Sequence, residues 1–411
     1  MFTAPRGARL HLGLFGRRNV GKSSLINGLT RQQTAIVSAV PGTTTDPVEK
    51  AMELLPLGPV LFIDTAGLDD DQGELGRLRV EKSRLAMERT DIALVVATGE
   101  AWDDLEERLV ADFRQRGTPV IVVFNQCDRV AAPIPTVERL MGLGIPVVAV
   151  SAKLGTNLGG LREALITAAP EGWIDPPTVA ADLVPPGGLV MLVVPIDKEA
   201  PKGRLILPQV QTIRDLLDGD AMVMVVKERE LQTAMQRLKR RPDLVVTDSQ
   251  AFLKVAADTP DEVPLTSFSI LFARYKGDLD TFVAGAAAID RLHAGSRVLI
   301  AESCAHHPIG EDIGRVKIPR WLQQYCGGQL DVHVASGRDF PSDLATFELV
   351  VHCGSCTTNR REVLARIARC RDAGVPITNY GIAIAKSLGI MERALGPFPS
   401  ALATWRANGQ L

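Results

Sequence analysis

A glycine-containing segment at residues 16–23 limits the possible folds of this chain more than any other feature. It reads Gly-Arg-Arg-Asn-Val-Gly-Lys-Ser and fits the pattern G-x-x-x-x-G-K-S/T. An apolar run over 10–15 precedes it and a helical pattern over 22–29 follows it, which is the strand–loop–helix context of a phosphate-binding loop. Backbone N–H groups of such a loop and of the helix N-terminus point at phosphate oxygens. The sequence therefore predicts a nucleotide-binding α/β domain.

Residues in and after this loop have groups suited to a magnesium–nucleotide complex. Lys22 supplies a positive charge for the β- and γ-phosphates, and the Ser23 hydroxyl binds the magnesium ion that bridges them. After the apolar run 60–63, Asp64 can hold magnesium through water and the Gly67 amide can contact the γ-phosphate. The loop residues expected to bind the nucleotide are Arg18, Asn19, Val20, Gly21, Lys22, Ser23 and Ser24.

Two further strand ends have residues suited to a guanine base. The segment 125–128 reads Asn-Gln-Cys-Asp, and Asp128 can accept hydrogen bonds from the N1 and N2 donors of guanine. The segment 151–153 reads Ser-Ala-Lys and can contact the base from the other side. Ligands of open α/β sheets bind at the carboxyl ends of the strands. We expect Asn125 and Asp128 to contact the base, together with Ser151, Ala152 and Lys153.

These motifs resemble those of the small-GTPase superfamily, specifically the translation-factor-like branch that contains Era and MnmE. The segment 41–46, Pro-Gly-Thr-Thr-Thr-Asp, is similar to the switch I signature of that branch. The resemblance implies that Thr44 is a ligand of magnesium and of the γ-phosphate. It also implies a GTPase in which Lys22, Thr44 and Gly67 act in hydrolysis.

Three positions bear on nucleotide affinity and on the rate of hydrolysis. Gln126 stands where the branch has lysine, so we expect weaker nucleotide binding, and Leu68 stands where Ras-like proteins have the glutamine that orients water, so we expect slow hydrolysis. Asn19 matches the loop asparagine that binds potassium in MnmE-like proteins. Potassium activation is one interpretation of Asn19, and a role only in shaping the loop is the other.

The rest of the chain alternates apolar strand patterns with helical patterns. Alternation of this kind favours parallel sheets with helices on their faces. The proline- and glycine-rich segment 170–188 indicates a linker, and 259–264 indicates a second junction. The second block has strand patterns at 189–195, 221–226 and 244–246. The third block opens with an apolar helical pattern over 265–292 and has strand patterns at 297–301, 330–335 and 347–351.

We therefore expect an α/β protein: a P-loop GTPase with a doubly wound sheet, followed by two smaller α/β domains. The expected domains are 1–172, 173–262 and 263–411. The net charge of −2 gives no basic field that would favour nucleic acid or an anionic membrane, and no apolar run is long enough to span a bilayer. The N-terminal residues have no signal-peptide pattern, so we expect a cytoplasmic protein.

Two small clusters of cysteine and histidine follow strand patterns of the third block. One contains Cys304 and His306, and the other contains His352, Cys353 and Cys356. Cys356 lies shortly before the helical pattern 359–371, where a helix dipole favours a thiolate. Three cysteines and two histidines can hold zinc or, through three thiolates, an iron–sulfur cluster, and the local pattern leaves both open. The remaining cysteines, Cys127, Cys326 and Cys370, each stand alone and indicate ordinary packing.

The combination of a GTPase domain, a middle α/β block and a C-terminal C-x-H plus H-C-x-x-C signature resembles the HydF family of FeFe-hydrogenase maturation GTPases. The resemblance implies a 4Fe–4S cluster on Cys304, Cys353 and Cys356, with His306 or His352 as a labile fourth ligand. It implies a scaffold that receives a two-iron precursor from two radical-SAM maturases of the HydE and HydG type and transfers it to apo FeFe-hydrogenase. It also implies a homodimer formed by the middle domain, for which the apolar run 189–195 is a candidate edge strand.

Two other functions remain open at this stage. One is an RNA- or ribosome-acting GTPase of the Era and MnmE class with a zinc-binding C-terminal module, and the other is a GTP-binding regulator with a redox-sensing cluster. An RNA-binding module would have a basic surface and stacking aromatic residues, whereas the chain has a net charge of −2 and only 5% aromatic residues. The composition therefore counts against the RNA-acting function. The scaffold is what the resemblance implies, and GTP acting as its switch is a hypothesis.

Overall fold

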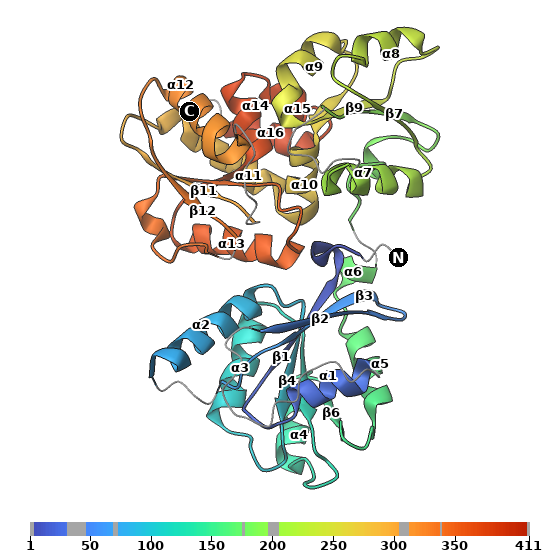
Figure 1. Cartoon of the computed structure of the whole chain (residues 1–411), viewed down its shortest axis with the longest axis vertical. Helices are drawn as coiled ribbons and strands as arrows, with labels where there is room; N and C mark the ends of the chain where they lie inside the picture. The colour runs from blue at the N-terminus through green and yellow to red at the C-terminus, as the bar shows by residue number, and fades with distance from the viewer. Residues whose placement is uncertain are drawn as a thin grey trace. The chain divides into compact units, whose positions relative to one another are not determined.

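The computed structural model describes residues 4–30, 47–68, 73–174, 177–195, 205–303, 312–337 and 339–408. The chain divides into two compact units, Met1–Pro176 and Pro177–Leu411 (Figure 1). Thr44, Cys304 and His306, expected from the sequence to be site residues, lie outside the described residues. In the described part of the chain, every helix is too short or too polar to cross a membrane.

The first unit is built on one mostly parallel sheet. In the described residues it has six strands in the order β2-β3-β1-β4-β5-β6, with β2 antiparallel to β3. The strands are β1 (Leu10–Phe15), β2 (Val48–Leu54), β3 (Gly58–Asp64), β4 (Ile92–Ala97), β5 (Val120–Phe124) and β6 (Val147–Ala149). The runs in β1, β4 and β5 are apolar because helices bury both faces of these strands.

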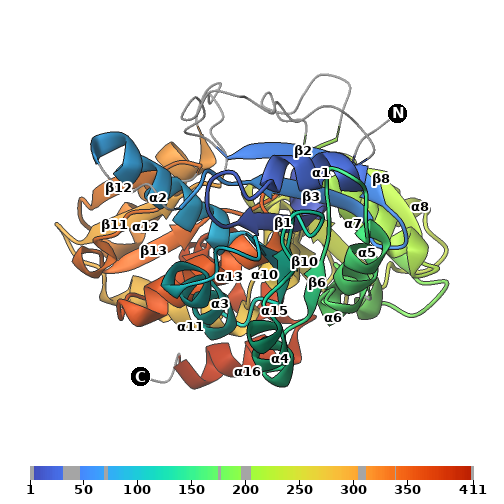
Figure 2. The same cartoon turned by 90° about the horizontal axis from the view of Figure 1, so that it is seen from below.

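The helices of the first unit cover both faces of the sheet, as Figures 1 and 2 show. They are α1 (Lys22–Thr30), α2 (Gly73–Glu88), α3 (Asp104–Gln115), α4 (Ile134–Gly142), α5 (Leu158–Thr167) and α6 (Glu171–Ile174). One core contains side chains of α1 and α5, and a second core contains side chains of α2, α3 and α4. This arrangement confirms the doubly wound nucleotide-binding sheet that the sequence predicts.

The second unit contains two parallel sheets, each with four strands in the described residues. Their orders are β10-β9-β7-β8 and β12-β11-β13-β14. The first consists of β7 (Leu189–Val193), β8 (Met222–Val226), β9 (Leu244–Thr247) and β10 (Leu265–Ser267), and the second consists of β11 (Arg297–Ala301), β12 (Asp331–Ala335), β13 (Leu349–His352) and β14 (Ile377–Asn379). Further α/β structure after the GTPase sheet agrees with the expected fold class. One continuous hydrophobic core includes residues of both sheets.

Helices of the second unit either cross over between strands of one sheet, or connect the two sheets or follow the last strand. They are α7 (Leu207–Asp218), α8 (Leu231–Arg237), α9 (Phe252–Asp258), α10 (Phe268–Lys276), α11 (Leu279–Ala286), α12 (Ile318–Cys326), α13 (Arg360–Asp372), α14 (Tyr380–Ser387), α15 (Met391–Leu395) and α16 (Pro399–Asn408). Those that cross over within one sheet are α7, α8, α9, α12 and α13. Helix α10 packs against α7, which belongs to the first of the two sheets, and against α13 and α14, which belong to the second. It therefore connects the two halves of the unit.

Two expectations for the second unit were wrong. The run 189–195 was the candidate edge strand, but β7 lies between β9 and β8, and the edge strands among the described residues are β8 and β10. The expected long helix over 265–292 begins instead with strand β10, whose three residues pair with β9, and it breaks between α10 and α11. Short apolar runs fit a buried strand or a buried helix equally well, so periodicity could not separate them. Strand β10 also lies beyond residue 262, where the sequence places the end of the middle domain.

Candidate functional site

The phosphate-binding loop begins where β1 ends, and its glycines are required by close backbone contacts. A Cβ on Gly16, whose φ is 142°, would lie 2.1 Å from the carbonyl oxygen of Val96. Gly21 has a φ of 86°, and a Cβ at this position would lie 2.4 Å from the side-chain nitrogen of Asn125. The Lys22 side chain crosses the loop, and its Nζ donates to the carbonyls of Gly16 at 2.9 Å and Arg17 at 2.7 Å. The loop is thus folded around the ammonium that would contact phosphate.

The two described magnesium ligands expected from the sequence lie together. The Ser23 hydroxyl, at the start of α1, donates to the carboxylate of Asp64, at the end of β3. Burial raises the pKa of Asp64, with the Ser23 hydrogen bond and the charge of Lys22 opposing the shift. The Leu68 amide donates to Gly16 O at 3.4 Å, so the turn that contains Gly67 reaches the phosphate-binding loop. These contacts bring a hydroxyl and a carboxylate together beside the phosphate-binding loop, and such groups could hold a magnesium ion.

Asn125 connects the three loops of the expected guanine site. Its amide nitrogen donates to Val20 O at 2.8 Å, and its amide oxygen accepts from the Ala152 backbone N–H at 3.0 Å. The Asn125 side chain is buried, so these bonds are shielded from water. Asp128 is exposed, and a hydrogen bond from Ser151 holds the pKa of its carboxyl below its usual range. Asp128 is therefore an anionic acceptor at the mouth of the site, beside exposed Lys153.

Gln126, the departure from the usual lysine, bridges two loops. Its Nε2 donates to Asn19 O at 2.9 Å, and its Oε1 accepts from Arg129 at 3.1 Å. Both Gln126 and Asn19 have positive φ values, 61° and 59°. The glutamine therefore makes a neutral hydrogen bond to the phosphate-binding loop, and the weaker nucleotide affinity expected from the sequence stays a prediction.

Arg17 forms ion pairs that the sequence motifs did not predict. Its guanidinium donates to Glu106 at 3.0 Å and also pairs with Asp103. Asp103 and Glu106 form the capping box of α3, and Glu106 is fully buried. The Asp-x-x-Glu spacing at 103–106 predicts the start of a helix. It does not predict that an arginine almost 90 residues earlier in the chain binds these two carboxylates. This network fixes the outer side of the phosphate-binding loop to α3.

The second candidate site lies at the carboxyl ends of the neighbouring strands β11 and β13. Ala301 pairs with His352 in the register of these strands, so the residues after them come together. The Cys353 sulfur accepts from the Ser303 backbone N–H at 3.1 Å and from the Ser355 backbone N–H at 3.5 Å. Two backbone amides and the Ser303 hydroxyl, 3.3 Å away, therefore surround this sulfur.

Cys356 is on the same loop, before helix α13. Burial raises the pKa of its thiol, and Cys353 adds to the shift while Lys276 opposes it. Asn359 caps α13 by accepting from the Glu362 N–H. Both thiols are only partly covered, so a metal group can reach them. The donor set of the loop 353–358, here called the cysteine loop, therefore fits thiolate ligation.

His352 is placed differently from the two cysteines. It is 1% exposed, its Nδ1 lies 2.8 Å from Cys353 O, and its Nε2 lies 3.1 Å from Nη1 of Arg366. Burial lowers its pKa to about 3, so the ring is neutral. Arg366 donates to Nε2, and Nδ1–H donates to Cys353 O. Both ring nitrogens are engaged with the chain itself, so His352 would have to leave these bonds to bind a metal.

Within the described ranges, no three His, Cys, Asp or Glu side chains are grouped closely enough to hold a metal ion. Cys304 and His306 are outside those ranges, so the full ligand set expected from the sequence is not tested. Cys326 and Cys370 lie on α12 and α13 and pack against the core. Cys127 follows β5.

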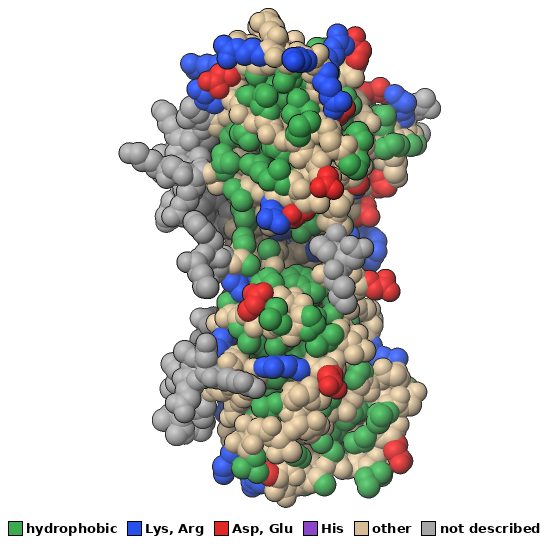
Figure 3. Space-filling view, turned by 90° about the vertical axis from the view of Figure 1, so that its right-hand side faces the viewer, with side chains coloured by type: hydrophobic (Ala, Val, Ile, Leu, Met, Phe, Trp, Pro, Cys, Tyr) green, Lys and Arg blue, Asp and Glu red, His purple; other side chains and the backbone are tan. Residues whose placement is uncertain are grey.

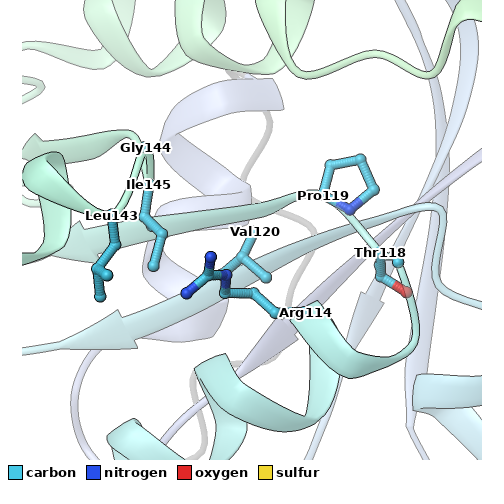
Figure 4. A pocket seen from close by; sticks show the side chains of 8 residues that line it. Arg114, Thr118, Pro119, Val120, Leu143, Gly144 and Ile145 are labelled. Carbon is cyan, nitrogen blue, oxygen red and sulfur yellow. The ribbon is translucent and has the colours of Figure 1, made fainter.

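One open cavity of about 390 Å³ lies in the first unit (Figure 4). It is lined by Arg114, Thr118, Pro119, Val120, Leu143 and Ile145, among others. These residues precede or begin β5 and β6, whereas the phosphate-binding loop lies at the opposite, carboxyl ends of the strands. The cavity is therefore separate from the nucleotide site.

The loops, the sheet order and the paired Ser23 and Asp64 define a P-loop GTPase domain followed by further α/β structure. A family model described as 50S ribosome-binding GTPase matches residues 11–126. The models for the hydrogen maturase F dimerization domain and tetramerization domain match residues 179–277 and 280–397. The chain belongs to the hydrogen maturase F family. The alternative function, an RNA-acting GTPase, would need a zinc-binding module after the GTPase domain. The two hydrogen maturase F family models match that part of the chain instead.

Curated relatives match the GTPase part of the chain. A tRNA modification GTPase MnmE from Heliobacterium modesticaldum is 39% identical over 155 residues, which are 36% of this chain and 32% of that protein. A GTPase Era from Halothermothrix orenii is 34% identical over 166 residues, 39% of this chain and 56% of that protein. The chain thus spans about a third to just over half of the length of these relatives. They are named GTPases, which supports GTP hydrolysis by this domain.

A solved structure of an Aquifex aeolicus Era variant bound to GDP and AlF4⁻ is 22% identical. It covers 53% of this chain and 93% of its own, with a TM-score of 0.36.

Proposed function

We propose that this hydrogenase maturation GTPase is a scaffold that holds a 4Fe–4S cluster and passes a two-iron precursor to apo FeFe-hydrogenase. The observation that carries the proposal is the cysteine loop, because Cys353 and Cys356 are half-buried thiols at the strand ends of a hydrogen maturase F segment. Cys304 would supply the third thiolate. A cluster held by three thiolates leaves one iron open, which is the position an incoming precursor needs.

His306 is the better candidate of the two histidines for a labile fourth ligand. The reason is the geometry of His352, which bonds to Cys353 O and to Arg366 through its two ring nitrogens. His352 would instead fix the end of β13 and the orientation of the cysteine loop. Domains 1–172, 173–262 and 263–411 would then carry nucleotide binding, dimerisation and cluster binding.

GTP would act as a switch through the loops around Thr44 and Gly67, with magnesium on Ser23, Thr44 and Asp64. Ordering of such loops by the γ-phosphate and magnesium is a general mechanism of GTPase switching. Hydrolysis would be slow because Leu68 packs against the hydrophobic core and cannot orient water. Asn19 is proposed to bind potassium. Equal hydrolysis rates in sodium and potassium would refute that role.

Self-association would use the edge strand β8. Met222 and Val225 on this strand are 53% and 44% exposed, and Val210 and Leu217 of the neighbouring α7 are also exposed. Figure 3 shows hydrophobic side chains gathered on the face of the second unit in view. An unpaired apolar edge can pair with the same edge of another copy. The other proposed partners, two radical-SAM maturases of the HydE and HydG type and apo FeFe-hydrogenase, follow from family membership.

Anaerobic iron and sulfide reconstitution tests the scaffold proposal. The wild-type protein should take up about four irons for each cluster and give an electron paramagnetic resonance signal when reduced. Cys353→Ala and Cys356→Ala should lose most of the iron, while the control Cys326→Ala should retain it. Stoichiometric zinc with no sulfide in the wild-type protein would refute the proposal.

The substitution Lys22→Ala tests the proposed role of GTP as a switch. Loss of the ammonium should abolish tight GTP binding but leave iron uptake unchanged, because the two sites belong to different compact units. If Lys22→Ala still supported full activation of apo-hydrogenase, GTP would not be the switch.

A further inference from the structure

A lysine is buried directly behind the cysteine loop. Lys276, the last residue of α10, is 2% exposed. Its Nζ donates to the carbonyls of Ser355 at 2.9 Å and Thr358 at 2.5 Å, and it lies 3.4 Å from the carbonyl of Cys356. In the part of the chain that the structure describes, the polar contacts of this ammonium are therefore with one loop, the loop that carries both thiols.

No carboxylate of the described ranges lies within hydrogen-bonding distance of the Lys276 ammonium. Among the described residues, its contacts are the three loop carbonyls and the ring of Phe272, 5.9 Å away. Glu362, the nearest acidic influence, is paired with Arg366 at 3.1 Å. Burying a cation is costly unless an opposite charge compensates for it. The fold thus keeps a positive charge where the carboxylate that acts on it, Glu362, is already paired with an arginine.

The groups that can neutralise Lys276 are the two cysteines. Nζ of Lys276 bonds to the carbonyls of Ser355 and Thr358, on either side of Cys356 in the loop, and lies 3.4 Å from the carbonyl of Cys356 itself. Thiolates at these positions, and an anionic cluster bound to them, would bring negative charge next to the ammonium. The position of α10 is fixed independently, because Arg360 of α13 donates to Tyr275 O at 2.8 Å. The position of α10 therefore does not depend on the hydrogen bonds of Lys276 alone.

We infer that Lys276 is the counter-charge of the cysteine loop, holding its carbonyls in place and offsetting the negative charge of the thiolates and of the cluster they bind. This inference rests on the proposed cluster-binding function. A fixed positive charge beside a cluster favours its reduced, more negative state, since cluster potentials depend on nearby net charge and hydrogen bonds. Lys276 belongs to the segment 179–277, matched by the dimerization model, whereas the cysteines belong to 280–397. The site therefore takes residues from both.

The test compares reduction potentials of reconstituted full-length variants. Lys276→Gln and Lys276→Met remove the charge, and Lys276→Arg keeps it. Lys386→Gln is the matched control, because Lys386 is a part-buried lysine of the same unit that pairs with Asp290. Both uncharged variants should show a more negative potential, with the reduced fraction at a fixed potential falling about tenfold, which is about 59 mV for a one-electron couple. Lys276→Arg and the control Lys386→Gln should have the same reduction potential as the wild type.

Several results would overturn the inference. Wild-type uptake of a cluster together with an unchanged potential and iron content in Lys276→Gln overturns it and leaves the proposed function standing. A wild-type chain that takes up no iron overturns both. If circular dichroism shows that neither uncharged variant folds before iron is added, while Lys276→Arg does, the lysine serves folding alone and the inference is again overturned.

Discussion

At the scale of single residues, neutral amide side chains hold the nucleotide loops together. Asn125 joins Val20 and Ala152, and Gln126 joins Asn19 to Arg129. The motif letters predicted which loops come together at the candidate nucleotide site, since phosphate and guanine chemistry limits their residue types and spacing; the contacts with the nucleotide stay a prediction. The motif letters did not predict these bridges or the bond between Arg17 and Glu106, because hydrogen bonds between distant residues leave no local periodicity.

The bridge made by Gln126 gives a first prediction. In Gln126→Lys the ammonium should form a charge-assisted bond to Asn19 O, and such bonds are stronger than neutral ones. GTP affinity should rise by about tenfold at most, or about 1.4 kcal/mol. Fluorescent nucleotide titration measures it. Gln126→Ala, which removes the bond, should bind more weakly than wild type, and equal affinity in that variant would contradict the bridging role.

A second prediction concerns His11 of β1, which is 1% exposed. Burial lowers its pKa to about 4 from 6.5. Below pH 6.5 the unfolded chain binds a proton at this position that the folded first unit does not accept until about pH 4. Stability should therefore fall as the pH drops through this window, by at most about 1.4 kcal/mol per pH unit.

Urea unfolding between pH 7 and pH 4 measures this slope. His11→Gln should flatten it, because glutamine does not titrate. His293→Gln, at a largely exposed histidine of the other unit, should leave the slope unchanged. An identical slope in His11→Gln and wild type would exclude His11 as the cause.

At the scale of elements, most strands were predictable, but their places in the sheets were not. Strands β1 and β4 are buried throughout and, apart from His11 of β1, carry no polar side chain, because they are covered on both faces. Strand β2, Val-Glu-Lys-Ala-Met-Glu-Leu, is half exposed at an edge and has no apolar run. Which strand of the second unit is the edge follows from pairing, which the sequence pattern does not encode. The cysteine positions were predicted as strand-end residues, but Lys276 was hidden in an apolar helical pattern far from them.

The edge position of β8 gives a third prediction. Met222→Lys combined with Val225→Lys should shift the protein from dimer to monomer, since two charges would be brought against two charges across a paired edge. Light scattering during size-exclusion chromatography measures the mass. Leu253→Lys, at an exposed leucine of α9, is the control and should remain a dimer. A dimer that survives both β8 substitutions would place the interface elsewhere.

At the scale of the whole molecule, the two compact units have separate cores. The first unit has one core on each face of its sheet, and the second has one core that includes both of its sheets. Units with separate cores can unfold separately, whereas the two sheets of the second unit should unfold together.

A fourth prediction follows from that separation. Scanning calorimetry should resolve two transitions. GTP with magnesium at about 100 times its Kd should stabilise only one of them, by about 2.7 kcal/mol. Binding of the iron–sulfur cluster should raise the midpoint temperature of only the other transition. A single transition that responds to both ligands would show that the units unfold as one.

Helix α10 has a consequence for how chains of this family can diverge. Its last residue, Lys276, supplies a cation to a loop in the following segment, and its body packs against helices of both sheets. Exchanging residues 280–397 alone between two relatives would place a foreign cysteine loop over this lysine. Selection on the loop therefore acts on α10 as well, and the two segments are expected to be inherited as one evolutionary unit.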